Sequence, residues 1–159
     1  MSPTLRYSLL LALALGFPAG SLNLAAAPVP VPQAQTASQD SLYKRLGGYD
    51  ALAAVTDDFL GRLTTDPKEG RFFVGLSTDS KIRTRQHVVD FLCVATGGPC
   101  KYTGRDMVTA HTGLGITEED WDISVRALGA TLSKFNVPAN LQQEVVSAIA
   151  PLKSQIVGH

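Results

Sequence analysis

The sequence predicts an all-α fold, and three observations lead to this prediction. Beyond the first 40 residues, apolar side chains recur three and four positions apart in every long segment, which is the spacing of one helix face. No segment combines alternating apolar and polar residues with enrichment in β-branched side chains, as a strand would. Glycine pairs at 47–48 and 97–98 stand where helices are expected to end.

Composition places the chain among folded proteins of balanced charge. Of the 159 residues, 45% are hydrophobic and 18% are charged, which is too apolar for an intrinsically disordered chain. The 14 basic side chains are matched by 14 acidic ones. We therefore expect no nucleic-acid partner, because nucleic-acid binding uses clustered lysine and arginine to displace counterions.

The N-terminal 40 residues are predicted to be a targeting signal and a linker. Arg6 precedes an apolar run over about residues 7–17, and three alanines follow at 25–27, the order of a cleaved secretory signal. The run is shorter than the roughly 20 residues that span a bilayer, although an uncleaved anchor is the alternative. Residues 28–40 are rich in proline and small polar residues and are expected to form an extended linker.

These features predict a mature protein that is exported, with the periplasm as its destination, and that is not stably inserted in a membrane. Residues 1–27 would be the signal peptide, 28–40 the linker and 41–159 the folded domain.

Cys93 and Cys100 are the only two cysteines, and their spacing is that of neither a CxxC redox motif nor a CxxCH haem-attachment site. Two cysteines also cannot close a zinc site alone. Cys93 falls near the end of an expected helix, and the "GGP" turn allows Cys100 to return beside the last helical turn. We expect a disulfide in an oxidising compartment. The alternative is a buried thiol at Cys93 and an unrelated exposed thiol at Cys100.

Three helical segments are expected before residue 98. "LYKRLGG" is a short helix or turn ended by glycines, and a longer helix should start with Asp50 as its cap and end at "TTDP". The buried face of that helix would carry Leu52, Val55, Phe59 and Leu63. A third helix should begin at a cap near Asp79 or Ser80. One side of it would carry Ile82, Val89 and Leu92, and an adjacent strip would carry Thr84, His87, Val88 and Phe91.

Two long helices are expected in the last third of the chain. "TEEDW" has the pattern of a capping box with Asp120 in its third helical position. The stripe that follows consists of Trp121, Val125, Leu128, Leu132 and Phe135. The final helix is expected to be kinked by Pro151. Its apolar face would carry Leu141, Val145, Ile149, Leu152 and Ile156.

His111 is the candidate functional residue. It lies four residues after Met107 on a short helix expected from about Gly104, which Gly113 and Gly115 end. A histidine in the last turn of a helix is also favoured by the helix dipole alone, so a purely structural role is the alternative.

As a metal ligand, His111 would need either histidine partners or a cofactor. His159 is expected to be exposed at the terminus, which leaves His87 as the only possible partner. A single imidazole suffices for haem iron, because the porphyrin supplies four other ligands. Apolar walls for such a pocket are available, although the same residues could equally be plain core: Phe59, Phe72, Phe73, Phe91, Met107, Trp121 and Leu128.

The order of motifs resembles that of group 1 truncated haemoglobins. The segments that carry this resemblance are "LYKRLGGYDAL", "DDFLGRL", "RFF", "ATGGP", "YTGRDM", "AHTGLGIT" and "NVPANL". They span nearly all of residues 41–157. The resemblance implies a shortened globin fold, in which two antiparallel helix pairs pack two-over-two around a non-covalently held b-type haem.

The resemblance also implies roles for individual residues. His111 matches the proximal ligand of the haem iron, and Phe73 matches the aromatic residue that contacts the porphyrin, with Phe72 beside it. Tyr102 matches a tyrosine that reaches one propionate, and Lys81 or Arg83 could pair with the other. Further positions match the walls of the haem pocket: Phe59, Leu60, Met107, Ile116, Trp121 and Leu128.

The distal side departs from the family pattern at Leu60, where many members carry a tyrosine that donates a hydrogen bond to bound dioxygen. Leu60 has no donor, so retention of dioxygen should be weaker unless another donor is present. Thr84 and Val88 are expected over the iron. His87 could ligate the iron on the distal side, act near it as a gate or hydrogen-bond donor, or be a solvated surface histidine.

The resemblance implies two possible functions, and a third possible function does not depend on it. The first is reversible binding of a diatomic gas, dioxygen or also nitric oxide or carbon monoxide, at iron opposite His111. The second is a bis-histidyl haem redox protein, ligated by His111 and His87, that serves electron transfer or nitrogen oxide and peroxide detoxification with a reductant of unknown identity. The third is a haem-free helical interaction module. We expect a binding protein rather than an enzyme, with secondary nitric oxide or peroxide chemistry as the alternative. Nucleophilic hydrolysis is not expected, because no serine, cysteine or aspartate has a recognisable nucleophile setting.

Overall fold

Residues 40–159 are described by the computed structural model, and all their regular elements are helical. The all-α prediction is therefore confirmed for this part of the chain. The predicted signal peptide and all of the linker except Asp40 lie outside the described residues. In chain order the elements are α1 (Leu42–Arg45), α2 (Gly48–Thr65), η1 (Glu69–Phe73), α3 (Thr78–Ala95), α4 (Met107–His111), α5 (Glu118–Lys134), α6 (Ala139–Ile149), η2 (Ala150–Leu152) and α7 (Lys153–Ile156).

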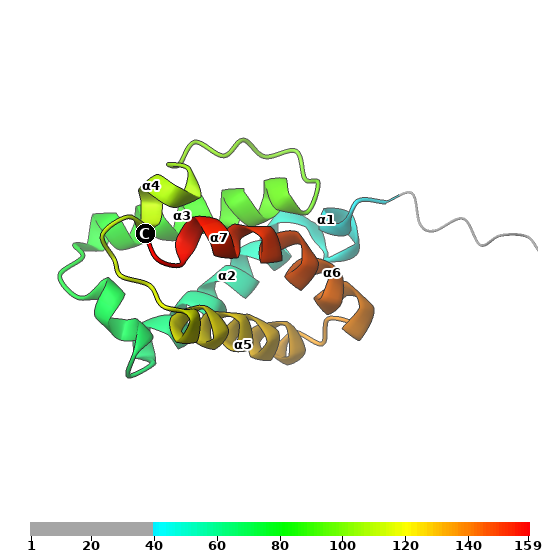
Figure 1. Ribbon diagram of the computed structural model, residues 1–159. Coiled ribbons are helices and arrows are strands. Elements are labelled where there is room, and N and C mark those ends of the chain that lie inside the picture. The colour runs from blue at the N-terminus through cyan, green and yellow to red at the C-terminus, as the bar shows by residue number, and fades with distance from the viewer. Residues whose placement is uncertain (1–39) are drawn as a thin grey trace, which may run out of the picture. The chain divides into compact units, whose positions relative to one another are not determined.

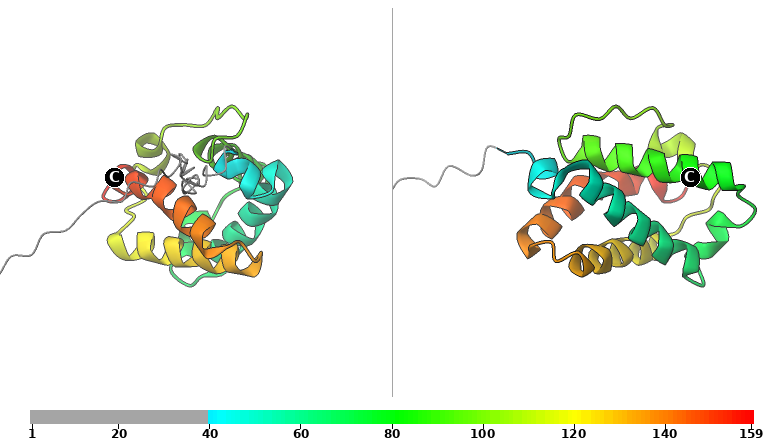
Figure 2. Two further views of the ribbon diagram at one scale, coloured as in Figure 1. Left: turned by 90° about the vertical axis from the view of Figure 1, so that its right-hand side faces the viewer. Right: turned by 180° about the vertical axis from the view of Figure 1, so that it is seen from behind.

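The long helices form two layers. Helix α2 packs against both α3 and α5, and α6 packs against α5 and α1. Helices α3 and α4 lie on one side of the domain and α5 lies on the opposite side, as all three views show (Figures 1 and 2). The short helix α4 packs against α7, so the C-terminal segment supports the element that carries His111.

The starts of α2 and α3 differ from the predicted ones. Helix α2 begins at Gly48 with Gly47 as its N-cap, and Asp50 lies inside the first turn. Gly47 has a φ of 98°, a left-handed conformation that glycine adopts without strain, so the chain passes from α1 into α2 with almost no loop. Helix α3 begins earlier than predicted because the hydroxyl of Ser77 accepts a hydrogen bond from the Ser80 amide (3.2 Å).

The capping box of α5 was predicted correctly. Thr117 is the N-cap, and its hydroxyl oxygen accepts from the Asp120 amide at 3.3 Å. In return, the Asp120 carboxylate accepts from the Thr117 amide at 2.8 Å. This reciprocal pair fixes the direction in which α5 leaves the loop that follows His111.

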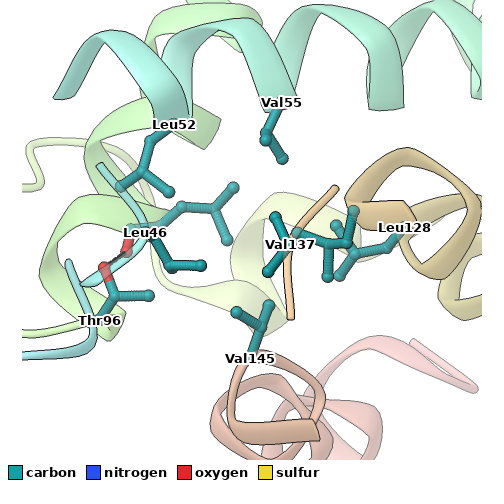
Figure 3. Close-up of a pocket in the computed structure, with 9 residues that line it drawn as sticks. Leu46, Leu52, Val55, Thr96, Leu128, Val137 and Val145 are labelled. Carbon is teal, nitrogen blue, oxygen red and sulfur yellow. Dashed lines mark hydrogen bonds between the residues drawn. The ribbon is translucent and has the colours of Figure 1, made fainter. Parts of the chain in front are cut away.

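The core consists of two apolar clusters that Leu46 and Ile149 join. The first contains Val55, Leu128, Leu132 and Val145, and the second contains Leu52, Leu92 and Cys93. Between them lies a cavity of about 20 Å³ (Figure 3). Its lining is apolar except for Thr96, whose hydroxyl donates to the Leu92 carbonyl at 2.7 Å, so the cavity offers a water molecule too few partners to hold it.

Two residues predicted to face the core are exposed instead. Ile82 is 59% exposed because it lies in the first turns of α3, before the buried segment that begins at Val89. Phe135 is 40% exposed because α5 ends one residue before it, at Lys134, and the helical stripe does not continue.

The last helix is broken where Pro151 was predicted to kink it. Helix α6 ends at Ile149, a short 3-10 turn contains the proline, and α7 resumes at Lys153. Proline lacks the amide hydrogen that a continuous helix would need at that position.

The predicted disulfide between Cys93 and Cys100 is present, with the two Cα atoms 5.9 Å apart. Among the described residues, none of the helices is both long and apolar enough to cross a bilayer.

Candidate functional site

Helix α4 holds His111 through polar caps rather than through buried side chains. The helix has five residues and none of them is buried. Asp106 caps its start, with Oδ1 accepting from the Thr109 amide (2.9 Å) and Oδ2 accepting from the Thr109 hydroxyl (2.7 Å). These donors, the Thr109 amide above all, lower the pKa of Asp106. The predicted start near Gly104 was therefore three residues early.

The tautomer of the His111 ring suits metal binding. Its Nδ1 lies 2.7 Å from the carbonyl oxygen of Met107, one turn earlier. A carbonyl only accepts hydrogen bonds, so Nδ1 carries the proton and donates it. In the neutral ring the other nitrogen, Nε2, then keeps its lone pair, the form in which an imidazole binds a metal ion. The donor chemistry of His111 therefore fits the iron of a haem.

His87 differs in that its Nδ1 is buried and has no hydrogen-bond partner among residues 40–159. The ring is half-buried in the middle of α3. An unsatisfied buried polar atom costs about 1–3 kcal/mol, so a group from outside the protein that reached this nitrogen would recover that cost.

Tyr102 covers His87. The centroids of the two rings are 6.0 Å apart and the rings meet edge to face, and Tyr102 contacts Phe91 in the same way at 5.5 Å. The Tyr102 hydroxyl donates to the Arg105 carbonyl at 2.6 Å. Burial, together with the nearby Asp106 carboxylate, raises the pKa of Tyr102. Reaching a haem propionate would require this hydroxyl to leave Arg105, so that role stays a prediction.

The "YTG" motif has a steric explanation. A Cβ atom added to Gly104 would lie 2.3 Å from the Tyr102 hydroxyl oxygen. Glycine at this position therefore lets the ring fold back over its own chain. The motif could be read from the sequence, but the close approach became visible only in the structure.

Phe72 and Phe73 lie in η1, which an ion pair ties to the start of α5. The guanidinium of Arg71 stacks on the Phe72 ring at 4.3 Å and donates to the Asp120 carboxylate at 2.7 Å. Burial alone would raise the pKa of Asp120, but hydrogen bonds from Thr117 and Arg71 outweigh it and lower the pKa. The aromatic segment and the entry to α5 are thus positioned together.

Glu69, next to this ion pair, was missed by the sequence reasoning. It is 3% exposed, and its Oε2 accepts from the Ser124 hydroxyl at 3.2 Å, while Oε1 has no partner among residues 40–159. Burial raises the pKa of Glu69, and the carboxylates of Asp120 and Asp66 add to the rise. Nothing in the sequence signals this burial, because a glutamate between two helices is usually solvated.

Most of the predicted pocket residues share one property, since they are neither fully buried nor fully exposed. This half-buried set is Phe59, Leu60, Phe72, Phe73, Thr84, His87, Val88, Phe91, Tyr102, Met107, His111, Ile116 and Trp121. Apolar side chains left half-exposed on α2, η1, α3, α4 and α5 fit contact with a large flat apolar group. Their individual contacts with such a group stay predictions.

Three residues predicted to contact the haem do not belong to this half-buried set. Leu128 is buried in the first core cluster, where it lines the small cavity of Figure 3. Lys81 and Arg83 are exposed at the start of α3, and neither forms an ion pair within residues 40–159. Their pairing with propionates stays a prediction.

Comparison with known proteins shows which family this chain matches. The sequence pattern described as "Bacterial-like globin" matches residues 41–157. The chain is similar to the group 1 truncated hemoglobin GlbN of Mycolicibacterium paratuberculosis, with 35% identity over 116 residues that cover 73% of this chain and 83% of that protein.

Solved structures agree with the sequence comparison. The truncated hemoglobin of Tetrahymena pyriformis in its Fe(III) form has a TM-score of 0.70 and 28% identity, and the match covers 76% of this chain and all of that one. The 2/2 hemoglobin of Synechococcus sp. PCC 7002, described with covalently attached heme, has a TM-score of 0.69 and 30% identity over the same shares.

Proposed function

We propose the function of this chain from one premise, which is that it belongs to the bacterial-like globins and, within them, to the group 1 truncated haemoglobins with the 2/2 fold. It is therefore a haem-binding globin. Our proposal is that it binds a diatomic gas reversibly at the iron of a b-type haem, on the side opposite His111. Dioxygen is the leading ligand, and nitric oxide and carbon monoxide are further ones.

The observation that carries this proposal is the hydrogen bond from His111 Nδ1 to the Met107 carbonyl. It fixes the tautomer whose Nε2 can bind iron, and it limits rotation of the ring. Haem, once bound, would supply the iron to which a gas molecule can bind. Asp106 holds α4 at its start, and the half-buried aromatic residues exclude water from the site.

A non-covalent haem is supported by the state of the cysteines. Cys93 and Cys100 are the only two in the chain, and they are paired with each other. Neither is free to form a thioether with a haem vinyl group. The pairing therefore argues against a thioether bond, which is one route to covalently attached haem.

Replacement of His111 by glycine tests the proposal. The variant should hold less than about a tenth of the haem that the unchanged protein holds, because the only protein bond to the iron is lost. Soret absorbance per mole of protein after gel filtration measures this. Added imidazole should restore part of it, and His159→Ala serves as the control because His159 lies exposed at the C-terminus. Normal haem content in His111→Gly would refute the proposal.

A second candidate function rests on the unsatisfied Nδ1 of His87. Iron or a bound ligand could recruit this ring, and two histidine ligands would make a redox protein rather than a gas carrier. A native ferrous spectrum with sharp six-coordinate bands that disappear in His87→Leu would favour this second function.

Under the first function, His87→Leu leaves the ferrous iron five-coordinate and affects only ligand escape. Loss of one hydrogen bond to the gas should speed dissociation of dioxygen by about tenfold, since 1.4 kcal/mol corresponds to that factor. The association rate should stay within a factor of about two. Stopped-flow mixing measures both rates.

Export to the periplasm is also proposed, on the signal-like N-terminal sequence and the disulfide. Cell fractionation followed by N-terminal sequencing of the mature protein tests it. A protein that stays in the cytoplasm with Met1 intact would contradict it.

A further inference from the structure

Residues 99–105, here named the strap, connect the end of α3 to the cap of α4. They run along α3 for much of its length, as Figure 1 shows, but they contain no regular secondary structure. Within the part of the chain that the structure describes, the strap makes no backbone-to-backbone hydrogen bond outside itself. The Tyr102 hydroxyl bonds to Arg105, which is also in the strap.

The strap is therefore tethered to α3 by side chains. One tether is the disulfide from Cys100 to Cys93, and the other is the ring of Tyr102 against His87 and Phe91. The turn before the strap does not depend on the disulfide, because the Gly98 amide donates to the Cys93 carbonyl at 2.7 Å. Loss of the disulfide would thus release the strap and leave the end of α3 in place.

The two cysteines differ in burial. Cys93 is 0% exposed and belongs to the second core cluster with Leu52 and Leu92, whereas Cys100 is half-buried and packs against that cluster from the strap. A reduced Cys93 would stay in the core, since a free cysteine packs as a small apolar residue. Cys100 would move with the strap. Opening the disulfide would therefore leave Cys93 in the core and let Cys100 move with the strap, and the core would lose no atoms.

We propose that the Cys93–Cys100 disulfide is a redox-operated latch that holds the strap, and with it Tyr102, against His87. The reductant is a dithiol. One of its thiolates attacks the sulfur of the less buried Cys100, the S–S bond breaks, and Cys93 leaves as a thiolate that takes a proton. The second thiol of the reductant then attacks its own mixed disulfide, releases Cys100 as a thiol and is itself oxidised to a disulfide, so two electrons and two protons reach the protein.

The consequence of the latch for haem chemistry rests on the proposed function. Tyr102 covers the side of His87 that faces the strap, so release of Tyr102 frees the His87 ring to move. The thiol state of the protein would then alter the distal side of the haem through His87. It would leave the bond between His111 and Met107 unchanged, because that contact lies within α4.

Limited trypsin digestion tests the latch directly, because the strap contains two exposed trypsin sites, Lys101 and Arg105. Haem-loaded protein is digested with and without dithiothreitol, and mass spectrometry follows the cleavage rate at each site. Cleavage after Lys101 and Arg105 should rise by about tenfold or more on reduction, because cleavage tracks the population of the open segment. Cleavage after Arg126 and Lys134 on α5 should change by less than about twofold.

Two digestion results would overturn the latch. Unchanged rates at the strap sites would show that Tyr102 holds the strap alone. Equal increases at the α5 sites would show that the disulfide stabilises the whole domain rather than the strap. The digestion does not require haem, so it can be repeated on haem-free protein if the proposed function fails.

The Cys100→Ser variant tests the coupling to His87 without any added reductant. It should be cleaved like the reduced protein and should be insensitive to dithiothreitol. Its haem absorption spectrum should differ from that of the unchanged protein, and the difference should vanish when His87→Leu is present in both. Rapid strap cleavage with an unchanged spectrum would refute the regulatory role.

Discussion

Helices α3 and α4 carry the two candidate histidines, His87 and His111, and the two helices are held in opposite ways. Helix α3 has 18 residues and buries Val89, Leu92 and Cys93 in the core. Helix α4 has five residues and buries none. A helix as short as α4 is not stable alone, so its position depends on the Asp106 cap and on its contact with α7.

This difference separates the stability of the fold from the positioning of His111, the proposed proximal ligand. Apolar packing sets where His87 lies, and hydrogen bonds to polar caps set where His111 lies. Substitutions in the core should therefore change the free energy of unfolding most. Substitutions at the caps should act chiefly on how firmly the haem is held.

The largest expected effect is that of Leu92→Ala. Removing a buried leucine side chain costs about 2–5 kcal/mol in the free energy of unfolding, and Leu92 lies in the second core cluster. Urea denaturation followed by circular dichroism measures it. Val94→Ala is the control on the same helix, because Val94 is exposed and should change stability by less than about 0.5 kcal/mol. Equal losses in both variants would contradict the assignment of the core.

The second effect is that of Asp120→Asn, which weakens the contacts between η1 and the start of α5. The carboxylate accepts from Thr117 and from Arg71, and losing charge-assisted bonds should cost about 1.5–3 kcal/mol at pH 7. The folded pKa lies below the ordinary value of 3.8. This contribution is thus complete above pH 3.8 and is lost as the pH falls through the folded pKa, so the two proteins should converge in strong acid.

Glu69 is a control in the same region, because its contribution to stability depends on pH in the opposite direction from that of Asp120. Its folded pKa lies above the ordinary value of 4.5, so its contribution to stability is greatest below pH 4.5 and is lost as the pH rises through the folded pKa. Glu69→Gln should therefore be tolerated at pH 7 far better than Asp120→Asn. A variant as unstable as Asp120→Asn at that pH would contradict the burial of an unsatisfied carboxylate oxygen.

Asp106→Ala is expected to change the free energy of unfolding least among these variants. Its main effect should be faster release of haem. Without its cap, α4 frays and the His111 ring loses its fixed position, so haem should transfer to excess apomyoglobin about three- to tenfold faster. The urea midpoint should hardly move. Asp79→Ala is the matched control, because Asp79 is an exposed acid in the first turn of α3. Equal haem loss in both variants would show that the cap does not matter.

Much of the fold could be predicted because helical periodicity and glycine positions are local properties. The capping box at Thr117, the break at Pro151 and the Cys93–Cys100 pair all follow from residues close together in the chain. The start of α2 was wrong because Asp50 is a good cap by type, yet Gly47 adopts the backbone geometry that begins the helix three residues earlier.

Less of the candidate site could be predicted. His111 was found from its spacing to Met107 and from the family resemblance, but its tautomer became visible only with the Met107 carbonyl in place. The hydrogen bond between Glu69 and Ser124 and the ion pair between Arg71 and Asp120 join residues of η1 to α5, about 50 positions apart. No sequence pattern encodes which surface a short loop segment will cover.

The sequence by itself determined that the chain is helical, where its helices end, and which histidine belongs to the short segment between glycines. These properties depend on backbone preferences and on spacing along one element. Only the tertiary structure decided that Tyr102 lies over His87, that Cys93 is fully buried while Cys100 is half-buried, and that Leu128 packs in the first core cluster. Each of these depends on which surfaces meet when separate helices pack, and that choice is made by the whole core at once.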